Sequence, residues 1–75
     1  MEIKKAAIIL QKPEQWLRLF LQNVENNPIG IAYKVSGSSR YDYYIEDFQL
    51  RKYVGEEKWL QGIKKWKENE KDVKN

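Results

Sequence analysis

The side chains with the strongest chemical character lie in one stretch, residues 36–48, with the sequence SGSSRYDYYIEDF. Three tyrosines and an arginine there offer flat aromatic faces and a guanidinium, and three carboxylates lie among and after them. Such a mixture fits an aromatic and basic platform for nucleic acid, an acidic patch for a protein, or simply the turn and second strand of a β-hairpin.

Catalysis is poorly supported by the composition. The chain contains no histidine and no cysteine, so the serines of this stretch have no imidazole to activate them, and thiolate or imidazole metal sites are excluded. Asp42, Glu46 and Asp47 could form a hard-cation site only with more convergent oxygen ligands than these. The four glycines form no phosphate-binding motif. We therefore expect a protein that is not an enzyme and carries no cofactor and no metal.

Protein binding is the function that the aromatic content favours most. Tyr, Trp and Arg are the side chains that anchor protein interfaces, and five tyrosines and three tryptophans are more than a core of this size is expected to bury. The alternation of a strand beginning at Tyr41 would point Tyr44 outward, with carboxylates on both sides to select a partner by charge. The predicted protein-contact residues are Arg40, Asp42, Tyr43, Tyr44 and Glu46.

A nucleic-acid-binding role is the alternative. An arginine beside tyrosines offers stacking platforms and a cation, and lysines elsewhere could contact phosphates. The neighbouring carboxylates would repel a phosphate backbone, however, and a net charge of +3 is mild for such a protein. The residues that this role would use are Lys34, Arg40, Tyr44, Lys64, Lys67 and Lys71.

The length of the chain and its apolar segments limit the kind of protein that carries these side chains. Seventy-five residues make one domain at most, which we place at residues 1–71 with a frayed tail at 72–75. No apolar run is long enough to span a bilayer, and no cleavage site follows the short apolar segment near the N-terminus. We expect a cytoplasmic protein without membrane contact, which acts as an inhibitor or adaptor of a larger protein assembly.

The first two predicted elements are a strand and a helix. Residues 3–10 form a short apolar run closed by Pro13, which favours a central strand. A helix follows over residues 14–26, because Pro13 suits a helix start and Asn27-Pro28 a helix end. Its apolar face is wider than one sheet can cover, so the spare part predicts a homodimer through this helix.

The remaining elements are a hairpin, an ambiguous segment and a second helix. Residues 29–35 alternate as a strand whose apolar side, expected to face the core, consists of Ile29, Ile31, Tyr33 and Val35. After a turn at Gly37, a second strand places Tyr41, Tyr43 and Ile45 inward. Residues 47–54 could be strand or helix, and we favour a strand. An amphipathic helix over residues 56–71, with an apolar stripe of Trp59, Leu60, Ile63 and Trp66, completes an α+β fold. We expect all three tryptophans of the chain to be core residues. The predicted order is β-α-β-β-(β)-α: a small, mainly antiparallel sheet covered by two amphipathic helices.

Overall fold

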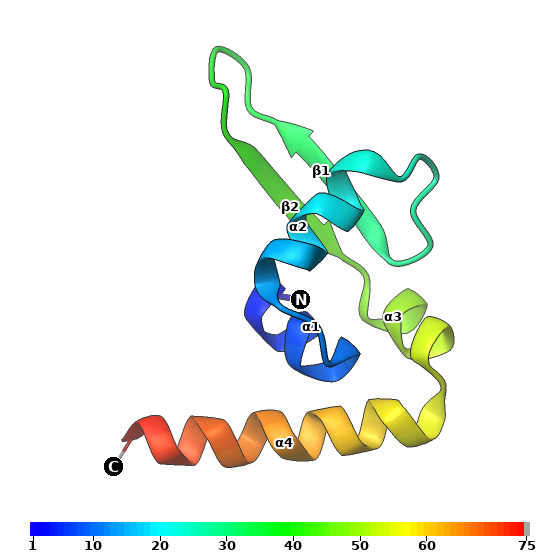
Figure 1. The fold of residues 1–75 in the computed structure, drawn as a ribbon, viewed down its shortest axis with the longest axis vertical. Coiled ribbons are helices and arrows are strands. Elements are labelled where there is room, and N and C mark those ends of the chain that lie inside the picture. Colours follow the sequence, from blue (N-terminus) through cyan, green and yellow to red (C-terminus); the bar gives the residue numbers. More distant parts are fainter. Residues whose placement is uncertain (75) are drawn as a thin grey trace.

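The computed structural model describes the backbone of residues 1–74 and the side chains of residues 1–69. The elements are α1 (Ile3–Leu10), α2 (Glu14–Asn23), β1 (Gly30–Lys34), β2 (Tyr41–Ile45), α3 (Asp47–Val54) and α4 (Glu56–Lys74). The molecule measures 39 × 30 × 17 Å, with the hairpin of β1 and β2 at one end and α4 lying across the other (Figure 1). The predicted α+β class is confirmed, although two of the expected strands are helices.

Helix α1 is the first of these corrections, because the prediction of a central strand over residues 3–10 is wrong. The apolar residues Ile3, Ala6, Ala7 and Leu10 recur at helical spacing, and alanine favours a helix. Ala6, Ala7 and Ile9 are buried in the structure. The helix ends at Gln11, whose left-handed backbone (φ 59°) lets the amides of residues 11 and 12 reach back to the carbonyls of the last turn.

Helix α2 forms where the sequence predicts it, with Pro13 at its N-cap and Glu14 in its first turn. It ends at Asn23, three residues before the predicted end. The side chain of Asn27 explains the ending: its Nδ2 donates to the Phe20 carbonyl at 3.1 Å, while its Oδ1 accepts from the Ile29 amide at 3.0 Å. One amide side chain therefore caps the helix and starts the next segment.

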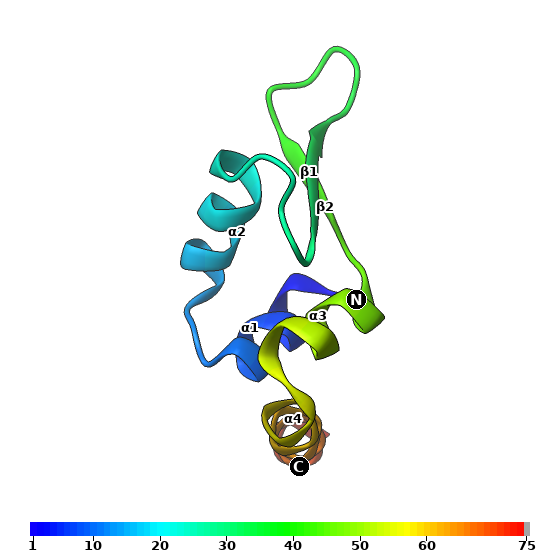
Figure 2. The same cartoon turned by 90° about the vertical axis from the view of Figure 1, so that its right-hand side faces the viewer.

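The hairpin is confirmed as the only sheet within residues 1–74, with antiparallel strands in the register Gly30↔Ile45, Ala32↔Tyr43 and Lys34↔Tyr41. Gly37 adopts a positive φ of 80° in the connecting turn, as predicted. Because the sheet has two strands, each strand leaves one edge of backbone groups without a partner strand. Figure 2 shows α2 against one face of the hairpin and no element against the other.

Helix α3 settles the segment that the sequence left open between strand and helix, and the favoured strand over residues 47–54 is wrong. Asp47 occupies the first turn and Arg51 and Lys52 the last, which complements the helix dipole at both ends. Gly55 then stops the helix with a φ of 91°. Arg51 donates two hydrogen bonds to the Glu56 carboxylate, one of them 2.6 Å from Nε, across this corner into α4.

Helix α4 packs against α1 through a glycine. A Cβ atom at Gly62 would lie 2.7 Å from the Cα of Ile9, so only glycine allows the two helices to approach this closely. Trp59, Ile63 and Trp66 are half-buried around this crossing, whereas Leu60, predicted to share their stripe, is 57% exposed. The helix continues to Lys74, beyond the predicted end at residue 71.

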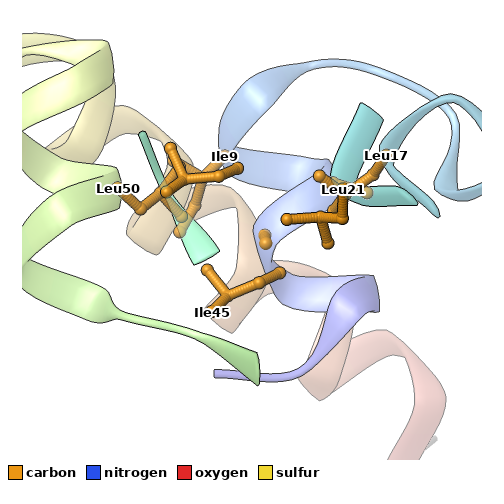
Figure 3. Packing of buried hydrophobic residues seen from close by; sticks show 8 residues of the cluster. Ile9, Leu17, Leu21, Ile45 and Leu50 are labelled. Atoms are coloured by element: carbon orange, nitrogen blue, oxygen red, sulfur yellow. The ribbon is translucent and has the colours of Figure 1, made fainter. Parts of the chain in front are cut away.

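The core is one cluster of buried side chains (Figure 3), against which Trp59 and Ile63 of α4 also pack. No polar or charged residue is buried in it among those that the structure describes. Its members come from α1, α2, β2, α3 and the residue before β1, so the hairpin base and the helices share one apolar centre. The cluster is Ala6, Ala7, Ile9, Leu17, Leu21, Ile29, Ile45 and Leu50.

Candidate protein-contact surface

The uncovered face of the hairpin carries a patch of large apolar side chains. In the strand register Ile31 lies opposite Tyr44, and Tyr33 lies opposite Asp42. The three large side chains among them are exposed: Ile31 by 57%, Tyr44 by 53% and Tyr33 by 46%. We call this surface the outer hairpin face and define it as Ile31, Tyr33, Asp42, Tyr44 and Glu46. It has an apolar centre and carboxylates at its border.

The outward position of Tyr44 confirms the predicted alternation of β2, but the prediction for β1 is wrong. Ile31 and Tyr33 were expected to face the core, and instead Gly30 and Ala32 face it. The reason is the size of the side chains. On the inner face, Gly30 lies opposite the larger Ile45 and Ala32 opposite the larger Tyr43, so each small residue leaves space for a large one. A Cβ atom at Gly30 would lie 2.2 Å from the Tyr44 carbonyl oxygen. The small size of Gly30 and Ala32 was therefore the feature of the sequence that indicated which side of β1 faces α2.

Tyr44 is held on this face by a hydrogen bond. Its hydroxyl donates to Glu46 Oε2 at 2.8 Å, two residues along the same side of the strand. This hydrogen bond, together with the negative charge of Glu46, raises the pKa of Tyr44 above its ordinary value. The ring is thereby oriented while it stays exposed to solvent.

Replacing Glu46 with alanine is expected to lower the pKa of Tyr44 toward its ordinary value. The raised pKa means that Glu46 favours the protonated phenol, so the contact is present at neutral pH and is lost as the pH rises through the Tyr44 pKa. An alkaline titration followed by NMR of the labelled tyrosine ring measures this shift. An identical Tyr44 pKa in both proteins would show that the hydrogen bond does not form in solution.

Two other predicted contact residues lie elsewhere. Tyr43 is half-buried on the inner face, where its hydroxyl accepts a hydrogen bond of 2.6 Å from Gln22 Nε2 of α2. Arg40 is exposed in the loop before β2, and its backbone amide donates to Ser38 Oγ at 3.0 Å. The structure thus brings Asp42, Tyr44 and Glu46 together, leaves Arg40 at the hairpin tip, and places Tyr43 in the packing between hairpin and helix.

The residues predicted for nucleic-acid binding do not form one surface. Lys34 and Tyr44 lie on opposite faces of the hairpin, and the Lys34 ammonium lies 5.2 Å from the ring centre of Tyr41. Lys64 and Lys67 are exposed on α4 at the other end of the molecule (Figure 1). The side chain of Lys71 lies outside the described residues.

Charge is divided between the two ends of the molecule. Residues 25–47, from the loop before β1 to the start of α3, carry four acidic and two basic side chains. The other residues whose side chains the structure describes, 1–24 and 48–69, carry five acidic and ten basic side chains. The hairpin end is therefore acidic and the helical end is basic. The mild net charge of the whole chain conceals this difference.

Helix α2 retains part of its predicted spare surface. Leu17 and Leu21 are buried, while Leu19 and Val24 are 45% and 40% exposed. Trp16 is 37% exposed, so the prediction that all three tryptophans are core residues is wrong for this one. Its ring stacks on Phe20 with 4.9 Å between ring centres.

Among the residues that the structure describes, no group of three or more acidic side chains is placed to hold a metal ion. In the same part of the chain, no helix combines the length and apolar character needed to cross a bilayer. Comparison of this chain with protein-family models, with curated proteins and with solved structures found no match.

Proposed function

We propose that this chain is a small non-catalytic protein-binding module, an inhibitor or adaptor of a larger assembly, that binds through the outer hairpin face. The observation that carries the proposal is the exposure of Ile31, Tyr33 and Tyr44 side by side on a face that no element of residues 1–74 covers (Figure 2). Exposed apolar groups of this size gathered on one surface are characteristic of interaction sites. Tyrosine adds a large contact area with few rotatable bonds.

The border of the face indicates the kind of partner. Asp42 and Glu46 flank the apolar centre, and Asp47 follows at the start of α3. Such an arrangement complements a protein surface with an apolar pocket and basic residues around it. The free edges of β1 and β2 add backbone groups that an extended segment of the partner could pair with.

Replacing Tyr44 with alanine is expected to weaken binding of that partner by about 2 kcal/mol or more, which is roughly 30-fold in Kd. Tyr44 stands at the centre of the face, and its ring is held by Glu46 before binding, so its loss removes both contact area and preorganisation. Leu60→Ala is the matched control, because Leu60 is 57% exposed on α4, far from the hairpin (Figure 1). It should leave the Kd unchanged.

The partner can be found with a photo-crosslinking amino acid placed at Ile31, compared with the same group at Leu60. A protein captured only from Ile31 is purified, and its Kd is measured by calorimetry for the natural chain, Tyr44→Ala and Leu60→Ala. Equal capture at both positions, or equal affinity of Tyr44→Ala and the natural chain, would contradict the proposal.

Self-association is an outcome of the same experiment. The predicted homodimer would use the exposed side of α2, where Trp16 and Leu19 lie. Sedimentation at two concentrations, with Leu19→Lys as the interfering variant, measures it. A dimer that Leu19→Lys dissociates would support that role for α2, while cross-links between copies from Ile31 would assign the hairpin face to a second copy.

A further inference from the structure

A basic groove with aromatic walls lies at the helical end of the molecule, away from the outer hairpin face. It consists of two adjoining hollows of about 480 and 340 Å³. The first lies at the turn between α1 and α2 and is lined in part by Lys4, Lys12 and Lys65. The second is lined in part by Lys12, Lys58, Trp16 and Tyr53. Lys12 lines both hollows, so they adjoin each other at this side chain, and we call the two hollows together the lysine groove.

Two lysines of the groove lie along α4. Lys58 and Lys65 are seven residues apart, which places them on nearly the same side of the helix and separates them by about 10 Å along its axis. Lys12 lines both hollows, whereas Lys58 lines only the second and Lys65 only the first. Lys4 adds a fourth positive charge at the first hollow.

The second hollow adds flat rings and an apolar floor. Trp16 and Tyr53 are 37% and 50% exposed there, and Ile9, Leu10 and Val54 lie beneath. The Lys12 ammonium lies 5.4 Å from the centre of the Trp16 ring. A cation therefore already lies at the Trp16 ring, which stacks on Phe20 and stays partly exposed.

We propose that single-stranded nucleic acid binds in the lysine groove, with phosphates along Lys58, Lys12 and Lys65 and a base stacked on Trp16. Single-strand binders combine a positive track for the backbone with aromatic platforms for the bases, and both features occur here. A base that stacks on Trp16 takes the place of the Lys12 ammonium, which can then bind the adjacent phosphate.

The charges around the groove favour nucleic acid over an acidic peptide. The cations that line the groove are lysines, which lack the planar fork that matches a carboxylate. Arg18 and Arg51 are already paired with carboxylates, Arg18 with Glu14 at 3.2 Å and Arg51 with Glu56. Glu14 is the one carboxylate that lines the first hollow, and Arg18 compensates it. Asp42 and Glu46, which would repel phosphate, lie at the hairpin end. The inference does not depend on the outer hairpin face.

The test is a titration of the whole chain with short, labelled oligothymidylate and oligouridylate at a series of salt concentrations. The natural chain is expected to bind at low salt. The triple variant Lys12→Gln, Lys58→Gln, Lys65→Gln should lose about tenfold or more in affinity, and its salt dependence should fall by about 2 in the slope of log K against log salt. No binding of either oligonucleotide at low salt overturns the proposal.

A second triple variant separates the groove from general charge. Lys34→Gln, Lys64→Gln, Lys67→Gln removes the same number of charges from exposed lysines outside the groove. It should keep most of the affinity. Equal losses in the two triple variants overturn the proposed site, because they show attraction to net charge alone.

The aromatic wall is tested by Trp16→Leu, with Tyr53→Leu as a second variant in case the first unfolds. Loss of a stacked base should reduce affinity about fivefold to a hundredfold and leave the salt slope unchanged. Unchanged affinity in both variants overturns the stacking arrangement. An acidic peptide with a central phenylalanine serves as competitor, and tighter binding of this peptide than of both oligonucleotides overturns the assignment to nucleic acid.

Discussion

Replacement of Leu50 by alanine is expected to lower the free energy of unfolding by about 2–5 kcal/mol. Leu50 is fully buried and is the one buried residue of α3. Its truncation leaves a cavity at the point where α3 is attached to the core, and α3 carries the chain from the hairpin to α4 (Figure 3). Urea unfolding followed by circular dichroism measures the change. A small domain has little stability in excess, so a sizeable unfolded fraction is expected in water.

Phe48→Ala is the matched control for this prediction. Phe48 lies in the same helix and is larger than leucine, but it is 70% exposed. Its removal should change the free energy of unfolding by no more than about 0.5 kcal/mol. If Phe48→Ala destabilised the protein as much as Leu50→Ala, α3 would have to pack through its other side.

Replacement of Gly62 by valine is expected to destabilise the protein by about 3 kcal/mol. Any Cβ atom at this position meets both the Cα and the side chain of Ile9 at 2.7 Å, and the backbone of α1 cannot yield as a flexible side chain would. On an exposed helix the same change would be slightly favourable, because valine has a higher helix propensity than glycine. The sign of the effect therefore reports the crossing of α1 and α4.

Gln61→Val provides the comparison, since Gln61 is the exposed neighbour of Gly62 on the same helix. It should alter stability by no more than about 0.5 kcal/mol. Gly62→Ala should fall between the two, because the gain in helix propensity offsets part of the clash. A neutral or stabilising Gly62→Val variant would show that α1 and α4 do not meet at this glycine.

The elements with strong end signals were predictable from the sequence. Pro13 and Glu14 mark the start of α2, Gly37 marks the hairpin turn, and Glu56 and Glu57 mark the start of α4. The segments of α1 and α3 are eight residues each, a length at which an apolar run does not by itself separate strand from helix. In α1 the helical spacing of Ala6, Ala7 and Leu10 was the better guide.

The candidate surfaces depended on contacts between distant residues. Tyr44 was predicted outward from the alternation of β2 alone, because Ile45 beside it had to be inward. The exposure of Ile31 could not be predicted from its hydrophobicity, since packing space under α2 is taken by Gly30 and Ala32. The lysine groove joins Lys12, Lys58 and Lys65, which only the fold brings together.

The decrease of burial along the hairpin has a consequence for its dynamics. Gly30 and Ile45 at the base are buried in the common core, whereas Lys34 and Tyr41 at the tip are exposed. Opening the tip therefore exposes little apolar surface. The amide hydrogens of the tip should exchange with solvent through a local opening of low free energy, whereas the amide hydrogens of the base should exchange only through global unfolding. The outer hairpin face thus has a rigid half at Ile31 and Tyr44 and an adaptable half at Tyr33 and Asp42. A protein bound to the outer hairpin face would contact both halves, one fixed and one able to adjust to its shape.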